Sequence, residues 1–115
     1  MNVPAYALAY IRDLDFGPEI IDYIEKIDAT LAPYGGRFIV HGGPIVPEEG
    51  EFEGDFVIIE FPDATAAEEW YSSPAYQEIL PLRTEHSRSM AGLLRGVPKD
   101  YRAVTKLEEL MADAG

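Results

Sequence analysis

The sequence contains no cysteine, which excludes disulfide bonds, thiolate metal sites and a cysteine nucleophile. Basic residues are scarce: 9 lysines and arginines stand against 21 acidic residues, so the formal net charge is −12. A chain this negative repels phosphate backbones and anionic lipids, so we expect neither a nucleic acid nor a membrane as a partner. The 2 histidines do not lie at metal-ligand spacing. We therefore expect no metal site and no cofactor.

Long apolar runs are also missing, and none approaches the roughly 20 residues that a membrane-spanning helix needs. The first 15 residues lack the basic start of a secretory signal, and Arg12 interrupts their short apolar run. These features favour a cytoplasmic protein. The chain of 115 residues is 47% hydrophobic, which is enough to form the core of one ordinary domain.

Apolar runs bounded by turn residues predict the strands of a sheet. The predicted strands are residues 5–12, 37–41, 55–61 and 90–94. The segment between the second and third strands is acidic and rich in glycine and proline, which predicts a hairpin loop or a frayed ribbon.

Helical spacing of apolar residues predicts the helices that connect these strands. The first helix begins at Pro18 and ends before the Gly35–Gly36 pair. Asp63 and Ser73 are suited to capping two further helical segments, and Pro81 predicts a kink or a split in the second one. An amphipathic helix is expected near the end of the chain, within residues 100–115.

The resulting order, β-α-β-β-α-β, predicts an α+β ferredoxin-like fold: a four-stranded antiparallel sheet with two helices on one face. We divide the chain into a ferredoxin-like domain, residues 1–97, and a C-terminal amphipathic helix or tail, residues 98–115.

Both faces of the predicted sheet are apolar. One is expected to carry Phe38, Val40, Val57, Ile59, Phe61, Ala91 and Leu93, and the other Tyr6, Leu8, Tyr10, Ile39, Phe56, Ile58, Met90 and Leu94. Two helices cover only one face, and an exposed apolar face of that size is unusual in a monomer. We therefore expect a homodimer through the uncovered face, with the C-terminal helix as further cover on its own subunit or on the partner's.

Several blocks of the sequence, in order, resemble domain-of-unknown-function family 1330. These blocks are PAYALAYI, YGGRFIVHGG, IIEFPDATAAEEWYSSPAYQ and the pair Leu82–Arg83, and the resemblance covers residues 3–97. It implies the dimeric α+β barrel architecture. That group contains cofactor-free monooxygenases, lactone isomerases and haem-handling enzymes, whereas the family itself implies no particular activity.

Arg37, His41 and Glu60 are the first candidates for chemistry. Strand periodicity places Arg37 and His41 on one face, with Glu60 near Arg37 on the adjacent strand, and we expect all three on the face opposite the helices. In the functional interpretation Arg37 binds a carboxylate or enolate, while His41 or Glu60 is a catalytic acid or base. In the structural interpretation Arg37 and Glu60 form a cross-strand ion pair, with His41 at the rim of the sheet.

Tyr6, Tyr10 and Arg83 are further candidate ligand-binding residues. The two tyrosines either donate hydroxyl groups to a pocket or pack across a dimer interface. The sequence thus predicts a small dimeric barrel that binds an organic molecule bearing a carboxylate or carbonyl group. Whether it is an enzyme stays open: cofactor-free monooxygenase or isomerase chemistry is one alternative, and a non-catalytic dimeric binding or interaction module is the other.

Overall fold

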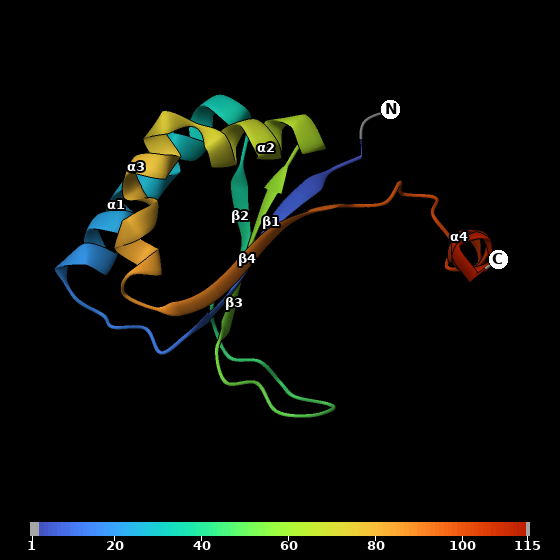
Figure 1. Cartoon of the computed structure of the whole chain (residues 1–115), viewed down its shortest axis with the longest axis horizontal. Coiled ribbons are helices and arrows are strands. Elements are labelled where there is room, and N and C mark those ends of the chain that lie inside the picture. Colours follow the sequence, from blue (N-terminus) through green and yellow to red (C-terminus); the bar gives the residue numbers. More distant parts are fainter. Residues whose placement is uncertain (1–2, 115) are drawn as a thin grey trace.

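The computed structural model describes residues 3–114, and its centre is a four-stranded antiparallel sheet. The strands, in the spatial order β2-β3-β1-β4, are β1 (Ala5–Arg12), β2 (Arg37–His41), β3 (Asp55–Phe61) and β4 (Arg88–Arg95). Helices α1 (Pro18–Leu31), α2 (Ala64–Ser72) and α3 (Pro74–Thr84) cover one face of it (Figure 1). The predicted ferredoxin-like fold is confirmed. Residues 1, 2 and 115, at the ends of the two predicted parts, lie outside the described residues.

A fourth helix, α4 (Val104–Ala114), stands on the other side of the sheet, apart from the rest of the chain (Figure 1). The loop between β2 and β3 projects to the same side from one end of the sheet, and the segment leading to α4 leaves from the opposite end. Among residues 3–114, no helix is both long enough and apolar enough to span a bilayer.

The helix ends follow from local sequence. The Asp63 carboxylate accepts a hydrogen bond from the Ala66 N–H at 2.8 Å, and the Ser73 hydroxyl accepts one from the Tyr76 N–H at 3.3 Å. Pro81 does not split α3, contrary to the expectation from its missing N–H. The helix continues through it to Thr84, and the Glu85 N–H still bonds to the Pro81 carbonyl at 3.0 Å.

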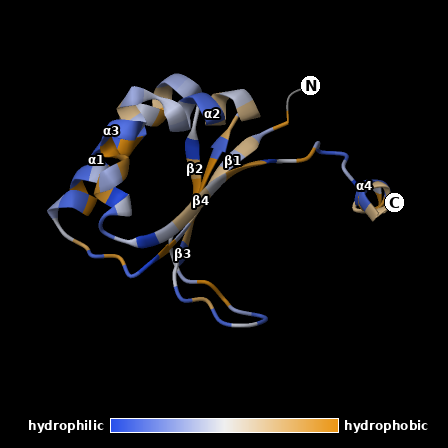
Figure 2. Ribbon diagram, in the orientation of Figure 1, coloured by the Kyte–Doolittle hydropathy of each residue, from blue (hydrophilic) through white to orange (hydrophobic). Residues whose placement is uncertain are grey.

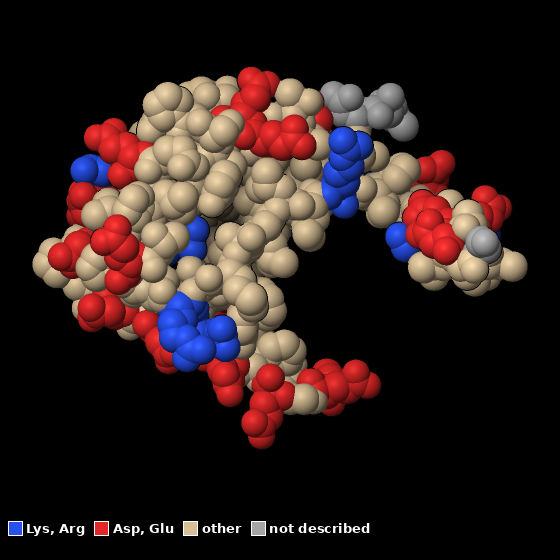
Figure 3. All heavy atoms as spheres, in the orientation of Figure 1, with Lys and Arg blue, Asp and Glu red and all other residues tan. Residues whose placement is uncertain are grey.

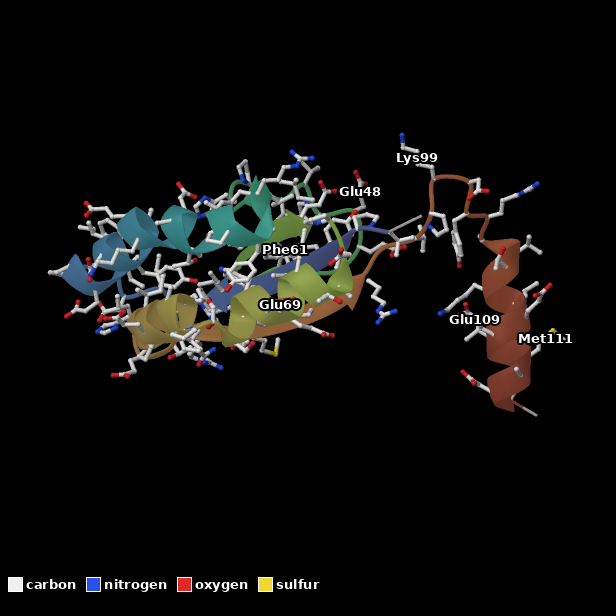
Figure 4. The ribbon with its side chains drawn as sticks, turned by 90° about the horizontal axis from the view of Figure 1, so that it is seen from above. Glu48, Phe61, Glu69, Lys99, Glu109 and Met111 are labelled. Atoms are coloured by element: carbon white, nitrogen blue, oxygen red, sulfur yellow. The ribbon has the colours of Figure 1, made fainter. Side chains whose placement is uncertain are left out.

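The hydrophobic core lies between the sheet and the helix layer. Phe61, labelled in Figure 4, is fully buried, and its ring centroid is 5.3 Å from that of Trp70. The indole N–H of Trp70 donates to the Thr30 hydroxyl at 3.0 Å, so the one polar atom of this side chain is satisfied inside the core. This packing fixes α2 against α1 and the sheet.

A β-bulge in β2 changes which side chains face the helices. Phe38 pairs with Ile59, but the next pairs are Val40 with Ile58 and His41 with Val57, so the register shifts at the intervening residue. One extra residue reverses the facing of everything beyond it. Val40 therefore lies on the open face and His41 on the helix side. The predicted faces of both residues, which assumed plain alternation, are wrong.

The face of the sheet opposite the helices is apolar and uncovered by any described element, as predicted. We call it the open face; its residues include Tyr6, Leu8, Tyr10, Val40, Phe56, Ile58, Met90 and Leu94. Figure 2 shows the apolar colour running along these strands, with α4 standing away from them. Met90 and Leu94 are exposed there, so this surface is available to a second molecule.

Candidate functional site

A cavity of about 490 Å³ lies between the sheet and the helices α1 and α3. Its floor on the sheet includes four small residues, Ala7, Ala9, Ala91 and Gly92, beside larger ones such as Val57 and Ile59, and isoleucines of α1 line the opposite wall. Small side chains facing large ones leave space that close packing would otherwise fill. Figure 3 shows a hollow in the surface between these two layers.

Three polar side chains meet in the wall of this cavity. The hydroxyl oxygens of Tyr23 and Tyr76 are 2.7 Å apart, and Arg83, only 6% exposed, donates from Nη1 to the Ser89 hydroxyl at 2.6 Å. The guanidinium also interacts with both tyrosine hydroxyls. We call Tyr23, Tyr76 and Arg83 the polar cluster.

In the polar cluster, the Tyr23 phenol stays neutral and the Arg83 guanidinium stays charged. Burial, followed by the neighbouring Tyr76 hydroxyl, raises the pKa of Tyr23 well above its ordinary value, against a smaller opposing effect of Arg83. Burial by itself lowers the pKa of Arg83, but the two tyrosine oxygens outweigh it, and the net shift is upward. The cavity wall therefore carries a fixed positive charge beside two hydroxyl groups.

This buried charge has no carboxylate partner. The ion pairs within residues 3–114 involve other basic side chains, and none includes Arg83. A guanidinium presents five N–H donors in a planar fork that matches a carboxylate. The arrangement is therefore suited chemically to binding an oxygen anion that enters the cavity.

His41 also lines the cavity, because the bulge in β2 turns it toward the helices. Its ring stacks on that of Phe38, with centroids 4.4 Å apart, beside Gly42 and Asp55 at the hairpin end of the sheet. β2 and β4 are the two edge strands, so three strand spacings, about 14 Å, separate the His41 position from the strand that carries Ser89. His41 and Arg83 thus face one cavity from opposite edges.

Arg37 and Glu60 form the predicted cross-strand pair, and they lie on the open face, where strand periodicity places them. The Arg37 Nη2 atom is 3.0 Å from Glu60 Oε1, and the Tyr6 hydroxyl donates to Glu60 Oε2 at 3.4 Å. The Tyr10 hydroxyl accepts a hydrogen bond from the Glu53 N–H at 2.7 Å, at the base of the hairpin. The structure therefore separates these four candidates from His41, which strand periodicity predicts on the same face, and from Arg83.

Sequence reasoning missed the role of Tyr23 and Tyr76 in this site. Tyr76 lies seven residues before Arg83, so both lie on one helix face, but this spacing is equally typical of residues that pack in a core. Tyr23 follows Ile20 by three residues, on the inner face of α1. The small residues at alternate positions of β1 were a second signal, since they leave room above the sheet. Within residues 3–114, no group of three or more side chains is placed to hold a metal ion.

Comparison with known proteins identifies the family. Residues 4–97 match the family model DUF1330, described as a domain of unknown function. The chain belongs to this family. The match confirms the resemblance inferred from the sequence, and it ends before α4. No curated protein matches the sequence.

Solved structures share the fold at low sequence identity. A dimeric ferredoxin-like protein of unknown function from Jannaschia sp. CCS1 is 15% identical, covering 79% of this chain and 97% of its own, with a TM-score of 0.64. A dimeric ferredoxin-like protein of unknown function from Thermobifida fusca YX is 12% identical, covering 84% and 93%, with a TM-score of 0.59. SnoaB, a cofactor-independent oxygenase from Streptomyces nogalater, is 14% identical, covering 89% and 100%, with a TM-score of 0.54.

Proposed function

We propose that the protein binds a small, mostly apolar organic molecule that carries a carboxylate or carbonyl oxygen, in the cavity between the sheet and the helices. The observation that carries this proposal is the buried guanidinium of Arg83, which lines the cavity without a carboxylate partner in residues 3–114. A buried charge without a counter-ion costs several kcal/mol. A ligand carboxylate or enolate would supply the missing anion. Because one O–H is used in the hydrogen bond between Tyr23 and Tyr76, the other hydroxyl of this pair would donate to the ligand's oxygen.

The walls of the cavity favour a flat or elongated ligand body. The cavity volume of about 490 Å³ is within the range of sites for drug-sized molecules, and its lining is mainly aliphatic and aromatic. A ligand anchored at Arg83 would have to extend most of the roughly 14 Å between the edge strands to reach His41. We therefore propose extended aromatic or aliphatic acids and their carbonyl analogues as the ligand class.

We also propose that the binding unit is a homodimer that buries the open face. The neighbours from Jannaschia and Thermobifida are dimeric ferredoxin-like proteins, which supports a second copy as the cover for this face. Met90 and Leu94 are exposed on it, and burying such side chains is favourable by about 1.5–3 kcal/mol each.

His41 favours a second candidate function, cofactor-free catalysis. An imidazole that lines the cavity is suited to accept a proton from a C–H or O–H group acidified by a neighbouring carbonyl. Arg83 would stabilise the resulting enolate. Return of the proton to another carbon would be isomerisation, and electron transfer from the anion to O₂ would begin oxygenation, the class of reaction named for SnoaB. The alternative is a binding module in which the cavity only holds its ligand.

A thermal-shift panel of aromatic and aliphatic carboxylates, 1,3-diketones and phenols tests the proposal. We expect at least one class to raise the melting temperature of the wild type and of Arg37→Met, but not of Arg83→Met. Arg37 is the matched control because it is an arginine of the open face, paired with Glu60. If no class stabilises the wild type, or if Arg83→Met responds equally, the proposal is wrong.

His41→Ala distinguishes the two candidate functions once a ligand class is known. For an enzyme, we expect the wild type to consume the ligand under air, and His41→Ala to bind it with little or no turnover. For a binding module, the wild type leaves the ligand unchanged over hours. Liquid chromatography with mass detection of the incubated ligand measures both outcomes.

A further inference from the structure

The C-terminal helix α4 presents an apolar stripe that no described residue buries. Val104, Leu107, Leu110 and Met111 are each more than half exposed, and no residue of α4 is buried. A helix of 11 residues is only marginally stable by itself in water. The stripe therefore needs a surface to pack against.

A second exposed apolar group lies at the rim of the cavity. It consists of Leu14, Phe16, Ile21 and Ile24, and we call it the rim. Leu14 and Ile24 line the cavity itself, and Phe16 is 67% exposed in the loop between β1 and α1. One chain thus carries two exposed apolar surfaces, each made of four large apolar side chains.

The α4 helix and the rim of the same subunit lie on opposite sides of the sheet (Figure 1). β4 ends at Arg95 beside Ala5, whereas Leu14 follows the far end of β1. In Figure 4, Met111 extends from the side of α4 that faces away from its own domain, and Glu109 lies on the side toward it. The stripe is therefore presented to a second molecule.

We propose that α4 of each subunit packs on the rim of the partner subunit and closes the partner's cavity. This inference rests on the proposed homodimer and on the proposed ligand cavity. The length of the connecting segment allows it: the eight residues 96–103 can extend about 26 Å. A partner sheet packed on the open face lies about 10 Å away, and its helix layer about 10 Å beyond that.

Charge favours the arrangement that brings α4 to the partner's rim. Residues 95–106, which connect β4 to the first turn of α4, carry Arg95, Lys99, Arg102 and Lys106 against one acidic residue, Asp100, and we call them the basic segment. The acidic residues Glu108, Glu109 and Asp113 follow later in α4. The hairpin between β2 and β3 carries Glu48, Glu49, Glu51 and Glu53, seen as a red group in Figure 3.

A two-fold axis that runs across the strands places each basic segment at the partner's hairpin end, which is also the end where the rim lies. An axis along the strands would instead bring two hairpins of four glutamates together. The glutamates of the two hairpins would then lie within a Debye length of one another and would repel each other. Charge complementarity and apolar contact therefore favour the same dimer, in which α4 of the second copy packs on the rim.

Single-cysteine variants test the contact directly, because the chain has no cysteine of its own. We would co-express differently tagged Phe16→Cys and Met111→Cys chains and oxidise the purified mixed dimers. A disulfide needs Cα atoms within about 7 Å, so only chains in contact should link. The matched control pairs Phe16→Cys with Asp113→Cys, since Asp113 lies on the opposite side of α4 from Met111.

We expect the first pair to give a covalent mixed dimer in about tenfold higher yield than the control pair. Hydrogen exchange gives an independent measurement: amides of α4 should be protected in the wild type and exchange freely in Phe16→Glu, whose substitution lies outside the open face. Thr105→Glu, on the polar side of α4, should keep the protection. Equal yields from the two pairs, or an unprotected α4 in the wild type, would overturn the inference.

Sedimentation of the wild type separates this inference from the proposed function. A mass equal to one chain at micromolar concentration would refute the homodimer. It would also refute the packing of α4 on a partner subunit, because no partner would be present. A mass of two chains, with neither cross-link nor protection of α4, would refute only the closing role of α4. Ligand stabilisation of a monomer would leave the cavity proposal standing and reject the partner's contribution.

Discussion

Filling the cavity with a larger side chain is expected to stabilise the protein, whereas the same substitution in the packed core is expected to destabilise it. The comparison tests whether the cavity is empty space. Ala9 lies on the sheet floor of the cavity, whereas Ala5, on the same face of the same strand, is 2% exposed and packed within the core. Replacing either alanine by leucine adds three carbons. The same substitution at two positions of one strand therefore tests the cavity with strand propensity held constant.

The magnitudes follow from burial and packing. At about 0.8 kcal/mol per buried methylene, three carbons placed in the cavity contribute up to about 2.4 kcal/mol at position 9. Ordering the leucine side chain costs roughly 0.5–1 kcal/mol, so Ala9→Leu should gain about 1–2 kcal/mol in free energy of unfolding. At Ala5, where the packing leaves no room, overpacking should cost about 1–3 kcal/mol.

Urea unfolding followed by the fluorescence of Trp70, the only tryptophan, measures both variants at one protein concentration. We expect the two free energies of unfolding to differ by about 3 kcal/mol, and Ala9→Leu to lose the ligand response of the wild type. If Ala9→Leu is destabilised as much as Ala5→Leu, the space above β1 is not available. The ligand proposal would then lose its basis.

Three further outcomes follow from the same structure. Arg83→Met should lower the free energy of unfolding by no more than about 1 kcal/mol, and it could raise it, because the substitution removes a buried charge that lacks a carboxylate partner among the described residues. A loss of about 3 kcal/mol, measured by urea unfolding, would contradict this expectation. Because the pKa of Tyr23 is raised on folding, its contribution to stability is complete below the ordinary phenol pKa of 10.0 and declines as the pH rises above that value. The urea midpoint of the wild type should therefore fall above pH 10, and it should fall less in Tyr23→Phe. Met90→Glu on the open face should raise the dimer dissociation constant at least about tenfold in sedimentation, whereas Glu69→Lys on the outer helix layer should not.

The sequence was sufficient to predict most of the fold, because its local signals agree with one another. Alternation and turn residues placed β1, β2 and β3 at their observed bounds, and Pro18 marked the start of α1. β4 begins at Arg88, two residues before the predicted Met90, since pairing with Arg12 extends a strand whose first residues are polar. These two residues join the strand because they pair with β1, so the local sequence pattern does not predict them.

The candidate site was harder to predict, because it depends on one residue that breaks the strand period. The bulge at Ile39 has no glycine to mark it, and it moves His41 from the open face to the cavity. Arg83 was identified as a candidate from its helical position, but its burial and its two tyrosine partners depend on how α1 and α3 pack. The periodicity of apolar residues predicts helices and strands, but it does not predict which side chains of distant segments meet.

Two arginines of this chain have the same chemistry in different environments, and the difference is the basis for proposing a ligand contact for only one of them. Arg37 has a side chain 69% exposed, pairs with Glu60 and is therefore worth no more than about 1 kcal/mol to the fold. Arg83 is buried against two tyrosine side chains and a serine hydroxyl, where methionine would fill the same space without a desolvation cost. Stability alone does not favour a buried arginine at this position, and close packing does not favour the cavity beside it. These two costs are the physical basis for the proposal that an anion from outside the chain binds there.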